Sequence, residues 1–144
     1  MSGRETPAQP RRPDWPERLM DLIEARRDAR FAWGPHDCCS FAADAVEAMT
    51  GRDWLAPHRD RYASEAEAEA IIGPDGLEAL VAGLLADFGA RDCPPGFVQR
   101  GDVALVLAGN DLTVGVVLGE SVAAPGLRRL AFVPRVAIQR AWSV

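Results

Sequence analysis

Residues 30–46 read RFAWGPHDCCSFAADAV and join a loop signal to the start of an amphipathic helix. A glycine and a proline interrupt regular structure, and Asp37 is of a residue type that caps helix N-termini well. Apolar side chains then recur at intervals of three and four residues, which is the spacing of one helix face. The stretch therefore predicts a helix that begins at Cys38, ends at Gly51 and packs one face against a sheet.

The rest of the chain falls into a helical half followed by a β-rich half. Apolar spacing predicts a helix over residues 15–29, and two more helices follow, the first opened by Ser64 in a capping box and the second capped by Asp75. Residues 102–119 form two β-rich runs around a Gly-Asn-Asp turn signal, which predicts a hairpin, and one or two further strands follow. Helices before an antiparallel sheet, built from residues 98–142, predict an α+β fold.

Length and composition fit one globular domain. The chain has 144 residues, of which 48% are hydrophobic and 26% charged, as in a folded protein with a sizeable core. Residues 1–13 carry three prolines and no apolar period. We therefore predict a flexible N-terminal arm over residues 1–13 and a single α+β domain over residues 14–144.

Charge and cysteine content exclude several classes of partner and location. The formal net charge of −5 argues against nucleic acid as the main partner. No apolar run reaches the length of a membrane span, and the polar, proline-rich N-terminus does not resemble a secretory signal peptide. We therefore expect synthesis in the cytoplasm and no membrane span. Three cysteines, two of them adjacent, favour reduced thiols over a disulfide framework.

Cys38 occupies a position that suits a nucleophile. The unpaired N–H groups and partial positive charge of a helix N-terminus favour the thiolate, which is the reactive form of cysteine. The backbone N–H of Cys38 is also placed to contribute to an oxyanion hole. The alternative is a packing role, because cysteine is often buried and Cys38 begins the apolar stripe of its helix. Periodicity alone favours the packing role and leaves both open.

Three groups of residues match the motifs of a known family. The matching residues are Phe31, Trp33, Gly34, Asp37 and Cys38 in the first group, Arg100, Gly101 and Asp102 in the second, and Val114, Gly115 and Gly119 in the third. On these motifs, which span roughly residues 30–125, the chain resembles the NlpC-type cell-wall cysteine peptidases, a compact branch of the papain-like fold. It is more similar still to small phage and prophage tail-associated proteins of unknown function that lack the full catalytic set.

The resemblance implies a papain-like α+β fold with Cys38 as nucleophile, but two further catalytic positions are changed. Thr113 stands where the family has its catalytic histidine, and Ala123 or a neighbour stands where the family has the polar residue that orients it. Neither side chain exchanges a proton near pH 7. Because general acid–base assistance contributes about 10²–10⁴ in rate, ordinary peptidase activity is not expected.

The chain has two histidines that bear on a substitute base. His36 lies just before Cys38, so its imidazole is a candidate catalytic base if it folds back towards the thiol. The alternative is a solvated histidine, or one bonded to a nearby carbonyl. His58 lies in a polar connection with no predictable relation to Cys38, and we expect it at the surface.

Four residues are candidates for ligand binding: Trp33, Asp37, Asp102 and Thr113. Trp33 is a candidate to line a groove beside Cys38, although a core position is favoured. Asp37 is interpreted mainly as the helix cap, and Asp102 mainly as a turn residue before a strand. The family resemblance is what adds Asp102 and Thr113 to the candidate site.

No metal or cofactor site is expected. Adjacent cysteines rarely ligate one ion together, and the sequence has no Cys-x₂₋₄-Cys pair. The glycines do not have the spacing of a phosphate-binding loop.

The expected function follows from the resemblance and its missing base. We expect a tail-associated phage or prophage protein, or a component of a phage-derived particle, that binds tail-tip proteins or peptidoglycan peptides through a degenerate peptidase fold. The alternative is an active cysteine hydrolase with Cys38 as nucleophile and His36 as base. A third reading is a cytosolic protein that uses the Cys38–Cys39 pair in thiol transfer or redox chemistry.

Overall fold

The helix predicted after Asp37 is present and lies at the centre of the fold. In the computed structural model, which describes residues 10–144, it is α2 (Cys38–Thr50). The Asp37 side chain accepts a hydrogen bond from the Ser40 backbone N–H at 3.0 Å, and the Ser40 hydroxyl accepts one from the Asp37 N–H at 2.8 Å. These two bonds form a capping box. Gly51 ends the helix in the left-handed conformation, as predicted.

Three other α-helices are close to their predicted places. They are α1 (Trp15–Arg26), α3 (Glu65–Ile72) and α4 (Gly76–Phe88). Ser64 caps α3 by accepting a hydrogen bond from the Glu67 N–H, as predicted, but the prediction that Asp75 caps α4 is wrong for its side chain, which makes no capping hydrogen bond. Within residues 10–144, no helix is long and apolar enough to cross a membrane.

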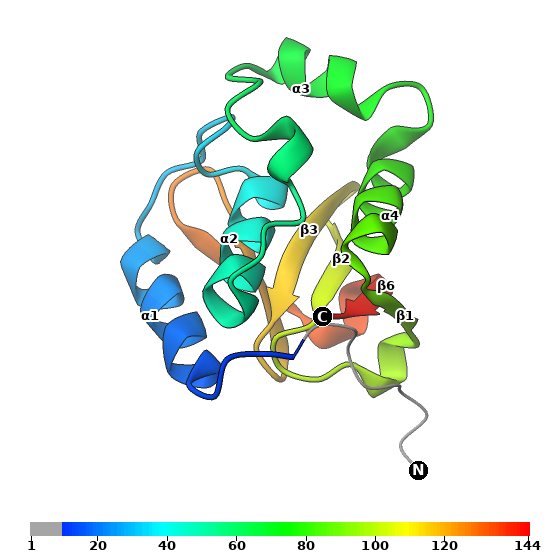
Figure 1. Cartoon of the computed structure of the whole chain (residues 1–144). Helices are drawn as coiled ribbons and strands as arrows, with labels where there is room; N and C mark the ends of the chain where they lie inside the picture. Colours follow the sequence, from blue (N-terminus) through cyan, green and yellow to red (C-terminus); the bar gives the residue numbers. More distant parts are fainter. Residues whose placement is uncertain (1–9) are drawn as a thin grey trace.

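Six strands form one antiparallel sheet in the order β1-β6-β2-β3-β4-β5 (Figure 1). The strands are β1 (Arg91–Cys93), β2 (Val103–Ala108), β3 (Asp111–Val117), β4 (Ser121–Pro125), β5 (Leu130–Pro134) and β6 (Ile138–Ser143). The predicted hairpin is confirmed, because β2 pairs with β3 and Ala108 lies opposite Asp111 across a two-residue turn. β1 was not predicted; its three residues are too few to show an alternating pattern.

Three of the helices, α1, α2 and α4, pack on one face of this sheet, and the predicted α+β class is confirmed (Figure 1). α1, α2 and α4 bury side chains against alternate strand residues such as Val103 and Leu105 of β2. The residues between them, Ala104 and Val106, belong to a smaller buried cluster on the other face. This alternation follows from the two-residue period of a strand. α3 stands apart from the core, and Ala68 is its buried residue.

The last residues of the predicted N-terminal arm belong to the folded domain. The Arg11 side chain donates hydrogen bonds to the Val144 and Arg100 backbone oxygens at 2.8 and 2.9 Å and pairs with Asp102 at 3.1 Å. The Arg12 N–H donates to a carbonyl at the end of α2. Arg11 and Arg12 of the predicted arm thus contact the domain that was predicted to begin at residue 14, and residues 1–9 of the arm lie outside the described part of the chain.

Gly115 in β3 gives a direct test of the packing between β3 and β4. A β-carbon at this position meets the Ala123 carbonyl oxygen and lies 2.7 Å from Val122 Cγ1, both in β4. We expect Gly115→Ala to lower the free energy of unfolding by about 1–3 kcal/mol, because the strands must separate to admit the methyl group. Urea denaturation measures the change.

The matched control is Gly83→Ala on the exposed side of α4, where a β-carbon has open space around it. Alanine forms helix better than glycine, so this variant is expected to be neutral or more stable by up to about 1 kcal/mol. Equal stability of Gly115→Ala and the unsubstituted protein would show that β4 is not held as closely as the structure has it.

Candidate functional site

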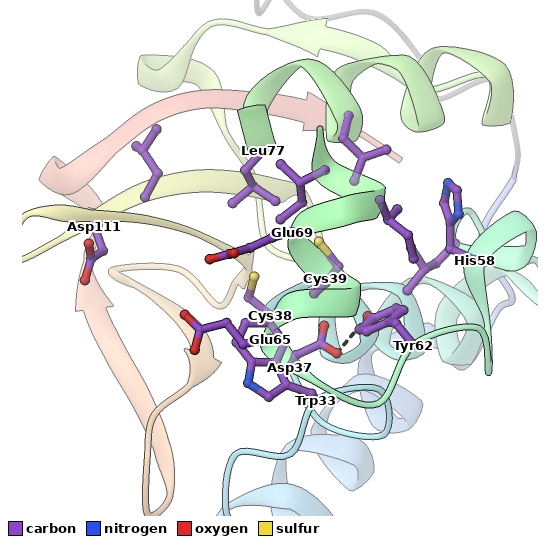
Figure 2. A pocket seen from close by; sticks show the side chains of 16 residues that line it. Trp33, Asp37, Cys38, Cys39, His58, Tyr62, Glu65, Glu69, Leu77 and Asp111 are labelled. Atoms are coloured by element: carbon purple, nitrogen blue, oxygen red, sulfur yellow. Dashed lines mark hydrogen bonds between the residues drawn. The ribbon is translucent and has the colours of Figure 1, made fainter. Parts of the chain in front are cut away.

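A cavity of about 460 Å³ opens at the N-terminal end of α2 (Figure 2). Its walls come from the loop before α2, the segment from Leu55 to Tyr62, α3, the start of α4 and the β3 end of the hairpin. The polar residues that line it are Asp37, Cys38, Cys39, His58, Tyr62, Glu65, Glu69 and Asp111. We call this cavity the Cys38 pocket.

Cys38 is the first residue of α2 and is partly exposed in this pocket. Its pKa is lowered to about 7 by three hydrogen bonds: one with the Cys39 thiol, which has the largest effect, one with the Val114 backbone and one with the Thr113 side chain. Burial and the nearby Asp37 carboxylate act in the opposite direction. A substantial fraction of Cys38 is therefore thiolate at neutral pH.

The neighbouring Cys39 has the opposite tendency. Its hydrogen bond to Cys38 is the largest cause of a raised pKa, and burial adds to it. Because Cys39 donates its proton towards Cys38, ionisation of one thiol disfavours ionisation of the other. Cys93 lies in the buried cluster on the opposite face of the sheet. Cys38 is therefore the cysteine that is available for chemistry.

Asp37 holds the pocket together. One of its carboxylate oxygens caps α2 through Ser40, and the other accepts hydrogen bonds from the Gly34 N–H at 2.8 Å and the Tyr62 hydroxyl at 2.7 Å. Burial, and then the bond to Asp37, raise the pKa of Tyr62 far above its ordinary value. Tyr62 thus remains protonated and donating. Asp37 is thus the helix cap, as interpreted from the sequence. It also anchors the loop before α2 and the segment that carries Tyr62.

The structure brings Thr113 to Cys38. Thr113 lies in β3, and its side chain is a hydrogen-bond partner of the Cys38 thiol. A hydroxyl polarises the thiol but does not accept its proton near pH 7. Ala123 lies buried in β4 opposite Val116 and supplies no polar side-chain atom. The two positions that the sequence resemblance aligns with a base and its orienting residue therefore hold groups without acid–base function.

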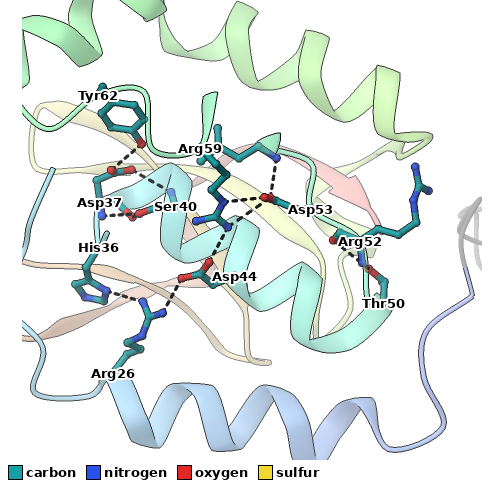
Figure 3. A network of polar contacts seen from close by, with 11 residues as sticks. Arg26, His36, Asp37, Ser40, Asp44, Thr50, Arg52, Asp53, Arg59 and Tyr62 are labelled. Carbon is teal, nitrogen blue, oxygen red and sulfur yellow. Dashed lines mark hydrogen bonds and ion pairs between the residues drawn. The ribbon is translucent and has the colours of Figure 1, made fainter. Parts of the chain in front are cut away.

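His36 points away from the Cys38 pocket, towards α1 (Figure 3). Its Nδ1 lies 3.1 Å from the guanidinium of Arg26, which can only donate, so the ring hydrogen resides on Nε2. Burial, and then the charge of Arg26, lower the pKa of His36, and the ring packs edge-to-face on Phe41. His36 is thus a buried, neutral histidine, and its Nε2 has no hydrogen-bond partner among the described residues, so it is neither solvated nor bonded to a carbonyl through its ring. In this arrangement it does not serve Cys38 as a base.

Arg26 belongs to a network of ion pairs behind the pocket (Figure 3). Asp44 of α2 accepts hydrogen bonds from Arg26 of α1 at 2.7 Å and from Arg59 at 2.6 Å, and Arg59 also pairs with Asp53 at 2.8 Å. Shared partners reduce the entropy cost of each pair, because each side chain is already held by another. The network fixes the segment from residue 53 to 59 against α2, and this segment carries His58 to the pocket.

His58 was expected at the surface, and its relation to Cys38 could not be predicted from the sequence. It is half-buried and lines the same pocket, on the opposite side from Asp111 in Figure 2. Sequence reasoning also missed Glu65 and Glu69, although their spacing of four residues places them on one helix face. Among the described residues, no group of three or more histidine, cysteine and acidic side chains is arranged to hold a metal ion.

The remaining candidates divide between pocket and scaffold. Trp33 lines the pocket, half-buried, with its ring edge-on to Phe31 at 4.8 Å, so the favoured core position is wrong for this residue. Trp54 lies in the core, as Trp142 does, and each is only 2% exposed. Asp102 is fully buried in the turn before β2, where it accepts a hydrogen bond from the Gln99 N–H and pairs with Arg11. It is a turn residue and does not line the Cys38 pocket.

A family model covers all of the described chain. The family described as domain of unknown function (DUF6950) matches residues 10–144. The chain belongs to this family. No curated protein matches the sequence. The match includes both the Cys38 pocket and the Arg11 contacts, so the DUF6950 family model begins before α1.

The hydrogen bond from Thr113 predicts how Cys38 of this DUF6950 domain reacts. Thr113→Val removes the hydroxyl and keeps the shape, so we expect the Cys38 pKa to rise from about 7. A rise of one unit slows alkylation at pH 7 about fivefold, because the thiolate fraction falls. The rate of iodoacetamide labelling of each cysteine against pH, followed by mass spectrometry, measures this.

Thr113→Ser is the control, since it retains a hydroxyl and should leave the labelling curve near that of the unsubstituted protein. Cys39 and Cys93 should stay unlabelled in the folded protein, because both are buried. If the Thr113→Val curve overlays that of the unsubstituted protein, the hydroxyl does not stabilise the thiolate.

Proposed function

We propose that this chain is a binding protein on a degenerate, NlpC-type papain-like fold. On this proposal it is made in the cytoplasm, enters a phage or prophage tail or a phage-derived particle, and binds tail-tip proteins or peptidoglycan peptides in the Cys38 pocket. The motifs that resemble the cell-wall peptidases support the proposal. The packing of the Cys38 helix on an antiparallel sheet is consistent with such a fold.

The observation that carries the proposal is the Thr113 side chain at the Cys38 thiol. Peptide hydrolysis requires a group that protonates the leaving amine. The Thr113 hydroxyl does not supply this proton, because it does not titrate near pH 7. The Nδ1 atom of His36 contacts the Arg26 guanidinium and is not free to accept a proton from Cys38. The raised pKa of Tyr62 keeps its hydroxyl from acting as a base near neutral pH. What remains is a shaped pocket with a partly ionised thiol, which can hold a ligand without cleaving it.

A cysteine hydrolase is the second candidate, and two observations favour it. The pKa of Cys38 is lowered to about 7, and His58 lines the same pocket. A movement that brought the His58 imidazole to the thiol would assemble a nucleophile and a base. His36, the base first considered, would have to break its contact with Arg26 to take that role.

Purified peptidoglycan and isolated tail particles separate the two candidates. The unsubstituted protein and Cys38→Ser are incubated with each, binding is measured by co-sedimentation, and soluble products are measured by mass spectrometry. We expect both proteins to bind at least one of the two preparations equally well and to release no product, because on this account the thiol is not a nucleophile.

Ala68→Phe is the binding control, since it places a ring into the pocket from α3 and should abolish co-sedimentation. Product released by the unsubstituted protein but not by Cys38→Ser would contradict the binding proposal and establish the hydrolase. His58→Gln then tests the base, and it should remove that activity if His58 supplies the proton.

A further inference from the structure

Three carboxylates at the Cys38 pocket have no ion-pair partner in the part of the chain that the structure describes. Glu65 and Glu69 of α3 and Asp111 of β3 are exposed and line the pocket, and within residues 10–144 none of them is in an ion pair. In contrast, the carboxylate of Asp44 behind the pocket forms ion pairs with two arginines. Glu65 suits the first turn of a helix, but Glu69 lies one turn further on and Asp111 lies in a strand.

The rest of the lining adds negative charge. Asp37 and the partly ionised Cys38 face the same space, and no arginine or lysine is among the described residues that line it. His58 is the one lining side chain there that can carry a positive charge. An anionic ligand would therefore meet repulsion in this pocket, whereas a cation would gain up to three unmatched partners.

Two aromatic rings also suit a cation. Trp33 and Tyr62 line the pocket, and Figure 2 shows Trp33, Glu65 and Cys38 at the same end of it. Aromatic faces attract cations, and arginine more than lysine forms such contacts while it also bonds a carboxylate. This end of the pocket thus combines a carboxylate with an aromatic ring.

The other end of the pocket is apolar and continues onto the surface. Ile71, Ile72, Leu77 and Leu80 line it from α3 and α4, and Leu112 lines it from the hairpin. Leu112 lies opposite Leu107 in the β2–β3 ladder, and each is 42% exposed. A small amine would leave this apolar surface uncovered, whereas a chain several residues long would cover it.

We propose that the Cys38 pocket binds a segment of a partner protein that carries an arginine or lysine side chain next to aliphatic residues. The cation lies at the end formed by Glu65, Glu69 and Trp33, and the aliphatic side chains lie against α4 and the hairpin tip. This inference rests on the proposed binding function and names its ligand class. It selects a protein partner over peptidoglycan because the apolar surface extends beyond the cavity.

An array of acetylated, amidated hexapeptides tests the proposal. One central position is arginine, lysine, citrulline or norleucine, and the flanking positions vary between leucine, isoleucine and serine. Citrulline keeps the shape of arginine without its charge. We expect the protein to retain arginine and lysine peptides with aliphatic flanks, and the best arginine peptide to bind at least tenfold more tightly than its citrulline counterpart in fluorescence anisotropy.

The double variant Glu65→Gln/Glu69→Gln should bring the arginine peptide to the affinity of the citrulline peptide while leaving the citrulline peptide unchanged. The matched control is Glu17→Gln/Glu120→Gln, which removes two exposed carboxylates that do not line the pocket and should leave both affinities unchanged. An equal loss of affinity for the arginine peptide in the two double variants would show that only the net charge of the protein matters. It would overturn the assignment of the cation site to Glu65 and Glu69.

Other outcomes separate this inference from the binding function beneath it. No preference for arginine or lysine across the array, with soluble peptidoglycan fragments bound instead, overturns the ligand class and leaves the binding function standing. Arginine amide that binds as tightly as the best hexapeptide overturns the protein segment in favour of a small amine. Cleavage of any probe that Cys38→Ser abolishes overturns the binding function itself.

Discussion

The buried carboxylate of Asp37 is the group on which the pocket depends. Its hydrogen bonds to Gly34, Ser40 and Tyr62 join the loop before α2, the helix and the segment before α3 at one point. Gly34 adopts φ +98°, and a β-carbon there would lie 2.7 Å from the Tyr62 carbonyl oxygen. Only glycine permits this close approach, so the loop geometry and the Asp37 contacts support each other.

The negative charge of the same carboxylate raises the pKa of the Cys38 thiol. Asp37 and burial both oppose a thiolate, and hydrogen bonds from Cys39, Val114 and Thr113 outweigh them. In a cysteine peptidase a protonated imidazole gives such support and also supplies a proton to the leaving group. Neutral hydrogen-bond donors stabilise the thiolate but do not supply a proton to a leaving group. On the proposed binding function, a stabilised anion therefore persists in a site without a base for hydrolysis.

Short-range sequence patterns correctly predicted the helix start and the hairpin, because residues close in the sequence determine both. The capping box at Asp37 and the two-residue turn of the hairpin are short-range patterns, and both are confirmed. β1 was missed because its three residues form a strand only by pairing with β6. Asp75 precedes its helix as predicted, but the chain there takes a helical conformation in which the side chain does not reach the free N–H groups.

The site itself depended on long-range contacts that periodicity does not encode. Thr113 entered the candidate site through a family resemblance, and the fold places it at Cys38. The direction of His36 is set by Arg26 on another helix, and His58 reaches the pocket because Arg59 is tied to Asp44. Each of these outcomes is decided by a partner distant in the sequence, so the residue type alone left the alternatives open.

The most direct test is whether the Cys38 thiolate exists without an imidazole partner. NMR of protein labelled with ¹³C at the cysteine β-carbons, together with the imidazole signals of His36 and His58, gives the titration of each group. The account predicts that Cys38 titrates near pH 7, that no imidazole shares its inflection, and that His58→Gln leaves its curve unchanged. A common inflection of Cys38 and His58, lost in that variant, would reveal a thiolate–imidazolium pair and contradict the account.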